Sequence, residues 1–301
     1  MKSDKLIRIN AEIAAALASN QPVVALESTV IAHGLPRPQN IETAERLEQI
    51  VRAAGAIPAT VAVINGALCV GLDRPELEQI ANGPDIKKLS VRDLAIAHAQ
   101  KWNGATTVAS TMWIARRAGI YVFATGGIGG VHRGSLPDVS ADLTELARTP
   151  MIVVCSGGKI VLDLPATREW LETNSVTVAG YGCDEMPAFY SRNSGLPIDV
   201  RCDSPQDVAR IFKAQADLNL DSALLVTVPV PRAGEVEISL LQAVLDESLV
   251  EAQRQTISGR NLTPFLLARM ADRSRGATLR ANIALLENNA RVAAEIACAL
   301  I

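Results

Sequence analysis

The chain has 301 residues and a formal net charge of -3 at pH 7; 49% of its residues are hydrophobic but only 3% are aromatic. This balance supplies no broad basic surface, which argues against nucleic acid or an anionic membrane as a partner. No apolar run predicts a membrane span, and the first ten residues carry charges rather than the apolar stretch of a secretory leader. Five cysteines without a CxxC pair indicate reduced thiols, so we expect a cytoplasmic protein.

Helix and strand patterns alternate along the chain. Apolar residues recur at helical spacing over 7–21, and a β-branched run at 22–29 predicts the first strand. A loop rich in Gly and Pro then leads to a helix over 41–55, with Asn40 as its expected N-cap and Gly55 as its stop. Further strands, some with the turn that follows them, are predicted at 59–66, 121–130, 151–158, 176–182 and 222–230; further helices are predicted at 74–82, 90–102, 167–174, 204–219 and 239–301, the last broken at 257–264.

This alternation predicts an α/β fold with three layers, α/β/α, around a largely parallel or mixed central sheet. No linker rich in Ser, Pro or Gly interrupts it, so we expect residues 1–301 to form a single catalytic domain with a helical C-terminal segment. Ligands of such sheets collect at the carboxyl ends of the strands. Glu27, the TGGIGG turn at 125–130 and the CSGGK turn at 155–159 are all predicted at such ends.

Lys159 follows a predicted buried strand and two glycines directly. Burial or a nearby cation can lower the pKa of an amine and make it a Schiff-base nucleophile. The alternatives are a phosphate contact, together with the amides of Gly157 and Gly158, or a lysine that extends into solvent. Glu27 is equally unusual, because burial at an apolar strand end raises the pKa of a carboxyl and suits a general acid. Its alternatives are a turn cap or an arginine pair.

The segment 124–146 is the densest polar region of the chain. Its glycines allow a close approach of the backbone to an anion, but the helix and acidic residue of a dinucleotide fold do not follow. His132 and Arg133 could meet phosphate or sugar hydroxyls, or could lie in a solvated loop. Asp138 and Asp142 suit a hard cation such as Mg²⁺ or Mn²⁺, although one of them could instead cap the helix that follows.

Two other polar residues are candidates for ligand contacts. Lys88 lies just before a helix that Ser90 could cap, and a cation there opposes the helix dipole unless an anion lies between. Asn282 lies on an apolar helix, where a buried amide needs a partner and could face a ligand. A solvated lysine and an amide satisfied within the core are the alternatives. The sequence has no zinc-ligand spacing and no GxSxG motif.

Together these segments resemble one known family. The pseudouridine-5'-phosphate glycosidases, also known through the indigoidine synthase A-like proteins, share the order and spacing of ALESTVIAHGLPRPQNIETA, LSVRDL, NGATTVASTM, FATGGIGGVHRG, DVSADLTEL, VCSGGKIVLDL, DEMPAFYSRNSG, LTPFLL and ANIALLENNA. The resemblance runs from about Ile9 to Ile301. It implies an α/β/α enzyme, usually a homotrimer, that reversibly splits pseudouridine 5'-phosphate into uracil and ribose 5-phosphate with a divalent cation, typically Mn²⁺.

The resemblance also implies roles for individual residues. Glu27 matches the family's proton donor, Lys159 matches its nucleophile, and Asp138 matches its metal contact. The positions that match substrate contacts or further polar residues of the active site are Lys88, Val108, His132, Ser140, Ala141, Asp142 and Asn282.

A lysine suits this reaction because the bond to be broken joins two carbons and offers no leaving oxygen to protonate. If Glu27 protonates the ring oxygen of the ribose, the ring opens and the Lys159 amine adds at the anomeric carbon, so that a lysine iminium forms as the base departs. The alternative enzyme is another Schiff-base sugar-phosphate lyase, and the alternative outside enzymes is a sugar-phosphate-binding protein. A carbohydrate kinase ranks third, because no recognisable nucleotide motif accompanies the glycine turn.

Overall fold

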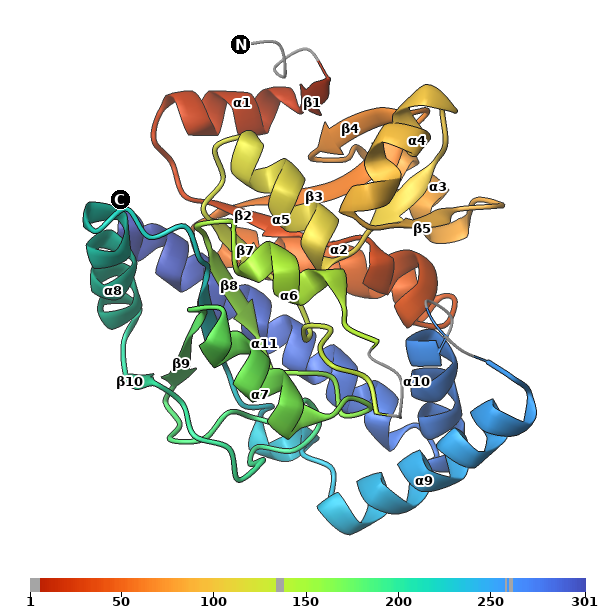
Figure 1. Ribbon diagram of the computed structural model, residues 1–301. Coiled ribbons are helices and arrows are strands. Elements are labelled where there is room, and N and C mark those ends of the chain that lie inside the picture. Colours follow the sequence, from red (N-terminus) through yellow and green to blue (C-terminus); the bar gives the residue numbers. More distant parts are fainter. Residues whose placement is uncertain (1–5, 134–137, 258, 260–261) are drawn as a thin grey trace.

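Parallel strands form the centre of the molecule (Figure 1). The structure, a computed structural model, describes residues 6–133, 138–257, 259 and 262–301. Within these residues the strands are β1 (Ile7–Ile9), β2 (Val23–Leu26), β3 (Ile57–Ile64), β4 (Ala67–Val70), β5 (Lys87–Leu89), β6 (Gly104–Thr106), β7 (Val122–Ala124), β8 (Ile152–Cys155), β9 (Thr177–Tyr181), β10 (Val200–Cys202) and β11 (Leu224–Thr227). They form one sheet in the order β1-β4-β3-β2-β7-β8-β11-β9-β10, to which β6 is joined through β3 and β5 through β6. All neighbours pair in parallel except β3 with β4 and β3 with β6, so the sheet is mixed.

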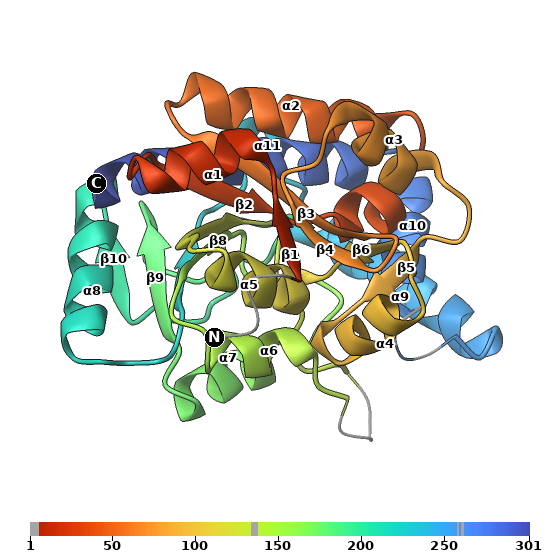
Figure 2. The same ribbon diagram turned by 90° about the horizontal axis from the view of Figure 1, so that it is seen from above.

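Helices cover both faces of this sheet (Figures 1 and 2). The described helices are α1 (Ala11–Ala18), α2 (Gln39–Ala53), α3 (Arg74–Asn82), α4 (Leu94–Ala99), α5 (Val108–Arg117), α6 (Ala141–Leu146), α7 (Leu164–Thr173), α8 (Pro205–Asp217), α9 (Ile238–Arg254), α10 (Leu262–Arg273) and α11 (Ala277–Leu300). Short helical turns lie at Val30–Gly34, Val91–Asp93 and Arg232–Gly234. The predicted three-layer α/β/α fold class is confirmed.

The strands β2, β7 and β8 are apolar at every position because both faces of the sheet are buried there. Val24 and Leu26 of β2 belong to one core, shared with residues of α2, α8 and α11, whereas Val23 and Ala25 belong to a second core, shared with residues of α5, α6 and α7. α11 belongs to the helical layer that covers the first core, because it contacts β2, β7 and β8 of the sheet and α2 and α8 beside it. Among the described helices, none combines the length and the apolar character that a bilayer crossing requires.

Several local predictions were wrong at the ends of helices. Residues 7–9 form β1 rather than the start of a helix, because they pair with β4, and the helix begins only after Asn10, whose side chain caps it by accepting a hydrogen bond from the Glu12 amide. Asn40 is not an N-cap: it lies inside α2 and donates from Nδ2 to the carbonyls of Ile31 and Ala81. The stop at Gly55 is confirmed, with φ of +92° just after the helix.

The remaining differences concern short elements. The helix expected over 90–102 is split into a 3-10 turn and α4, and β4, β5, β6, β10 and α5 fall outside the predicted elements. Each missed strand has only three or four residues, which is too short for a periodic pattern to stand out. All five cysteines are unpaired.

Candidate active site

A small cavity of ≈ 60 Å³ lies where β2, β7 and β8 end. Glu27, Lys88, Lys159 and Asn282, all predicted from the sequence as site residues, line this cavity together. The register of the sheet explains much of this meeting. Leu26 pairs with Ala124, and Ala124 pairs with Val154, so the ends of three neighbouring strands are level. Residues that follow these strands therefore face the same space.

Glu27 is the buried carboxyl of the cavity. Glu27 is only 8% exposed. Its Oε1 accepts a hydrogen bond from Oγ1 of Thr125, the residue that follows β7. Burial raises the pKa of Glu27, while the positive charge of Lys159 and the hydrogen bond from Thr125 act in the opposite direction. A carboxyl with a raised pKa retains its proton further toward neutral pH, which is what a proton donor requires.

Lys159 reaches the cavity from a tight turn after β8. Gly157 has φ of +81°, and a Cβ atom there would lie 2.0 Å from the carbonyl oxygen of Pro187, so only glycine fits. The backbone amide of Lys159 then donates to the carbonyl of Ile128 at 3.2 Å, which joins this turn to the glycine turn after β7. The nearby thiol of Cys155 is fully buried, and burial raises its pKa to about 12, so it is not a competing nucleophile.

Asn289 of α11 fastens the two turns together, a role that the sequence analysis missed. It is fully buried, and its Nδ2 donates to the carbonyl of Thr125 at 2.9 Å and to Oγ of Ser156 at 3.1 Å. Asn282 lies about two helical turns earlier on the same helix and is 6% exposed. The helix α11 therefore supplies both a residue that lines the cavity and the residue that joins the two turns beside it.

Asp142 is buried and bonded to backbone amides rather than facing the cavity. Its Oδ1 accepts from the Ala109 amide at 3.0 Å and its Oδ2 accepts from the Gly129 amide at 2.8 Å. It thereby ties the glycine turn to the start of α5. The N-cap of α6 is Ser140, whose Oγ accepts from the Asp142 amide, so the prediction that Asp138 or Asp142 caps this helix was wrong.

The other predicted contacts are not among the residues that line the cavity. Val108 is the first residue of α5 and is buried, and Ala141 is the first residue of α6 and is exposed. His132 is half-buried; burial lowers its pKa most strongly and the charge of Asp138 opposes this, while the charges of Lys159 and Lys88 lower it further. These electrostatic interactions show that His132 lies within the field of both lysines.

Asp138 is the residue of this region that best fits a metal ion. It is exposed, and its carbonyl accepts the amide of His132 at 2.8 Å, which places it beside the turn. Asp142 has both carboxylate oxygens engaged by amides and is the poorer ligand. Within the described residues no group of three or more His, Cys, Asp or Glu side chains is arranged to hold a metal. A hard cation that keeps most of its waters needs only one or two protein oxygens, which is compatible with Asp138.

His33 also lines the cavity, and the sequence analysis did not select it. Its Nε2 is buried, and within the described part of the chain it has no hydrogen-bond partner. Burial lowers the pKa of His33, as does the positive charge of Lys88, so the ring is neutral near pH 7. It lies in a short π-helical turn just after Glu27, a kind of turn that is common at functional sites and that is recognised only in the structure.

Comparison with known proteins places the chain in a family. A family model described as "Indigoidine synthase A like protein" matches residues 12–299. The chain belongs to this family. It is 50% identical over 293 residues to the pseudouridine-5'-phosphate glycosidase of Solibacter usitatus, covering 97% of this chain and 98% of the relative. It is 46% identical over 302 residues to the protein of the same name from Arabidopsis thaliana, covering 99% and 92%.

Two solved structures of similar proteins share the fold of this family member. The prealnumycin C-glycosynthase AlnA, solved in complex with ribulose 5-phosphate, has a TM-score of 0.91 and 41% identity, covering 99% of this chain and 97% of that one. An indigoidine synthase A-like protein from Thermotoga maritima has a TM-score of 0.89 and 37% identity, covering 97% and 95%. The family resemblance predicted from the motifs is thus confirmed, as is membership of a family of enzymes named for glycosidic chemistry.

Proposed function

We propose that the protein is a pseudouridine-5'-phosphate glycosidase that reversibly forms uracil and ribose 5-phosphate, with Lys159 as nucleophile and Glu27 as proton donor. The observation that carries this proposal is the meeting of a buried carboxyl of raised pKa with a lysine in one cavity. Relatives that match nearly the whole chain bear this name, and AlnA was solved with a five-carbon sugar phosphate.

In the proposed route the proton of Glu27 passes to the ring oxygen of the ribose, and the ring opens at the anomeric carbon. The amine of Lys159 forms a bond to that carbon. The lone pair of the Lys159 nitrogen then forms a C=N iminium bond to this carbon as the carbon–carbon bond to uracil breaks. The electron pair of the broken bond leaves with uracil, whose ring carbon takes up a proton, and water hydrolyses the iminium to release ribose 5-phosphate and the free lysine. The burial of Glu27 supports this order of events, because the acid must be protonated before the ring opens.

The remaining residues are proposed to bind the substrate and a metal. Lys88 and neutral His33 line the cavity and provide hydrogen-bond donors to a phosphate or to sugar hydroxyls. We further propose substrate contacts by Asn282 in the cavity and by Val108, His132, Ser140, Ala141 and Asp142 around it. Asp138 would hold a divalent cation, which the family resemblance implies to be Mn²⁺ and which would neutralise anionic oxygens of the substrate. A homotrimer in the cytoplasm is part of the same proposal.

Trapping of the lysine adduct tests the nucleophile. The protein is incubated with ribose 5-phosphate, reduced with borohydride, digested and analysed by mass spectrometry; we expect the sugar adduct on Lys159. Lys159→Ala should lose both the adduct and turnover, whereas Lys213→Ala, on the exposed surface of α8, should retain both. Glu27→Gln should bind the substrate but not cleave it.

The same experiment separates the alternatives. Adduct formation without release of uracil from pseudouridine 5'-phosphate would favour another Schiff-base sugar-phosphate lyase. Binding of ribose 5-phosphate with no adduct and no turnover would favour a sugar-phosphate-binding protein. Near-normal turnover by Lys159→Ala would remove Lys159 from the role of nucleophile.

A further inference from the structure

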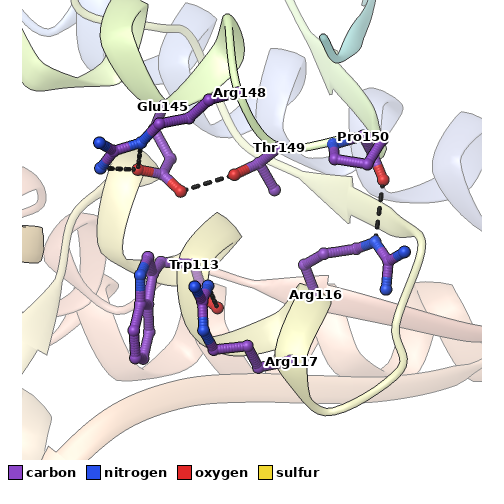
Figure 3. Close-up of a pocket in the computed structure, with 7 residues that line it drawn as sticks. All are labelled: Trp113, Arg116, Arg117, Glu145, Arg148, Thr149 and Pro150. Atoms are coloured by element: carbon purple, nitrogen blue, oxygen red, sulfur yellow. Dashed lines mark hydrogen bonds and ion pairs between the residues drawn. The ribbon is translucent and has the colours of Figure 1, made fainter. Parts of the chain in front are cut away.

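A second pocket, of ≈ 630 Å³, lies at the other end of the strands, and we call it the arginine pocket (Figure 3). Its lining residues come from the end of α5 (Trp113, Arg116, Arg117) and from the end of α6 and the loop to β8 (Glu145, Arg148, Thr149, Pro150). Lys159 follows the carboxyl end of β8, whereas Pro150 precedes its first residue. The whole strand therefore separates the arginine pocket from the candidate active site.

Positive charge is in excess in the arginine pocket. Three guanidinium groups line it but only one carboxylate, that of Glu145. Glu145 is 2% exposed, and both of its oxygens are already engaged: Oε2 accepts from Nε and Nη2 of Arg148 at 2.9 and 2.6 Å, and Oε1 accepts from Oγ1 of Thr149 at 2.6 Å. The carboxyl ends of α5 and α6 contribute roughly one further negative charge between them. About one positive charge remains uncompensated.

Arg116 and Arg117 are held in place by contacts other than carboxylates. The guanidinium of Arg117 lies 3.7 Å from the centroid of the Trp113 ring, and its Nη1 donates to the Trp113 carbonyl at 3.1 Å. The guanidinium of Arg116 lies 4.4 Å from the centroid of Tyr121, and its Nε donates to the Pro150 carbonyl at 3.1 Å. Stacking on aromatic rings and hydrogen bonds to carbonyls fix the orientation of the two guanidinium groups. Most of their positive charge stays available to a ligand.

Burial and the neighbouring arginines both disfavour the charge of Arg117. Burial lowers its pKa most strongly, the charges of Arg148 and Arg116 lower it further, and only Glu145 acts in the opposite direction. An anion between the two sides of the pocket would relieve this repulsion. Figure 3 shows Glu145, Arg148 and Thr149 on one side and Trp113, Arg116 and Arg117 on the other.

We propose that the arginine pocket binds a small anion that carries a diphosphate or triphosphate group. Planar guanidinium groups form paired hydrogen bonds to phosphate oxygens, and groups on both sides of the pocket can contact successive phosphates. The volume lies within the range of pockets that hold drug-sized small molecules. This site is independent of the chemistry proposed for Glu27 and Lys159.

Trp113 can report binding directly. In a Trp102→Phe, Trp170→Phe background it is the only tryptophan of the chain, so its fluorescence is titrated with pyrophosphate at constant ionic strength. We expect a saturable change with a Kd below about 1 mM. Arg117→Gln and Arg116→Gln should each weaken binding about tenfold or more, whereas Arg210→Gln, an exposed arginine of α8, should leave it unchanged. Unchanged melting temperatures in all three variants would exclude a folding defect.

Two parallel titrations locate the ligand. Lys88→Met should not change the pyrophosphate affinity reported by Trp113, because Lys88 belongs to the other cavity. Ribose 5-phosphate, with a single phosphate, should bind at least about tenfold more weakly than pyrophosphate in this assay. The proposal is overturned if Trp113 gives no saturable response, if the Arg117→Gln and Arg210→Gln variants bind equally well, or if Lys88→Met alone abolishes binding.

Discussion

Thr125 Oγ1 donates a hydrogen bond to Glu27 Oε1 across the ends of two adjacent strands, β7 and β2. The acceptor is the buried carboxyl that we propose as proton donor, so the threonine sets both its position and its acidity. The hydrogen bond favours the charged form and works against the burial that raises the pKa of Glu27.

Thr125→Val should therefore raise the pKa of Glu27 further. The donor form of a general acid is lost as pH rises through its pKa, so the alkaline limb of kcat/KM should move to higher pH in this variant. Thr125→Ser retains the hydroxyl and should keep the wild-type profile. A pH profile of pseudouridine 5'-phosphate cleavage measures the shift, and movement of the limb to lower pH would contradict the assignment.

Asn289→Ala should remove the contact that joins the turns at Thr125 and Ser156 beside the candidate active site. The hydrogen bonds from its side-chain amide to Thr125 and Ser156 are fully buried. We therefore expect a loss of about 2 kcal/mol of unfolding free energy and a fall in kcat of roughly tenfold or more. Asn288→Ala is the matched control, because Asn288 is only partly buried and its Oδ1 accepts from Arg291 on the surface. Chemical denaturation and steady-state kinetics should separate the two variants; equal stability would show that the buried amide is dispensable.

Gly157→Ala should be far more damaging than Gly119→Ala. Both glycines have positive φ, +81° and +91°, so both variants lose about 1 kcal/mol to backbone strain. Only at Gly157 does the added Cβ also meet a carbonyl, that of Pro187, which should bring the loss to about 3 kcal/mol or more and displace Lys159. Thermal unfolding of both variants, with borohydride trapping as a measure of Lys159 placement, gives the comparison.

Asp138→Asn and Asp142→Asn should fail in different ways. Asp138 is exposed, so its variant should keep the wild-type melting temperature while the Mn²⁺ concentration for half-maximal activity rises about tenfold or more. Asp142 accepts two buried amides, so its variant should lose about 2 kcal/mol of stability with or without metal. Melting curves and metal titrations of both proteins test this; a metal response changed only in Asp142→Asn would reverse the two roles.

The sequence predicts two residues of the candidate active site from their positions at the ends of strands. Glu27 and Lys159 were identified because each follows an apolar run, and parallel strands bring such positions to one edge. The roles of the loop residues and the metal contact came from the family resemblance rather than from periodicity. Those roles stay predictions.

What could not be predicted depends on contacts between distant parts of the chain. Asn289 lies on the helix 277–300 like any core amide, and nothing local shows that it reaches the turns at 125 and 156. Asn40 has the residue type and position of a cap, but its partners are carbonyls of Ile31 and Ala81. The short strands β4 to β6 are likewise stabilised by pairing around β3 rather than by their own patterns.

The position of α11 has a consequence for the folding of this protein. Its 24 residues come after every described strand of the sheet in the chain, yet they contribute both Asn282 and Asn289 to the candidate active site. A chain that has formed its sheet but has not yet docked α11 lacks one wall of the cavity and the contact between the turns at 125 and 156. Catalytic competence should therefore require docking of α11 in addition to a complete sheet.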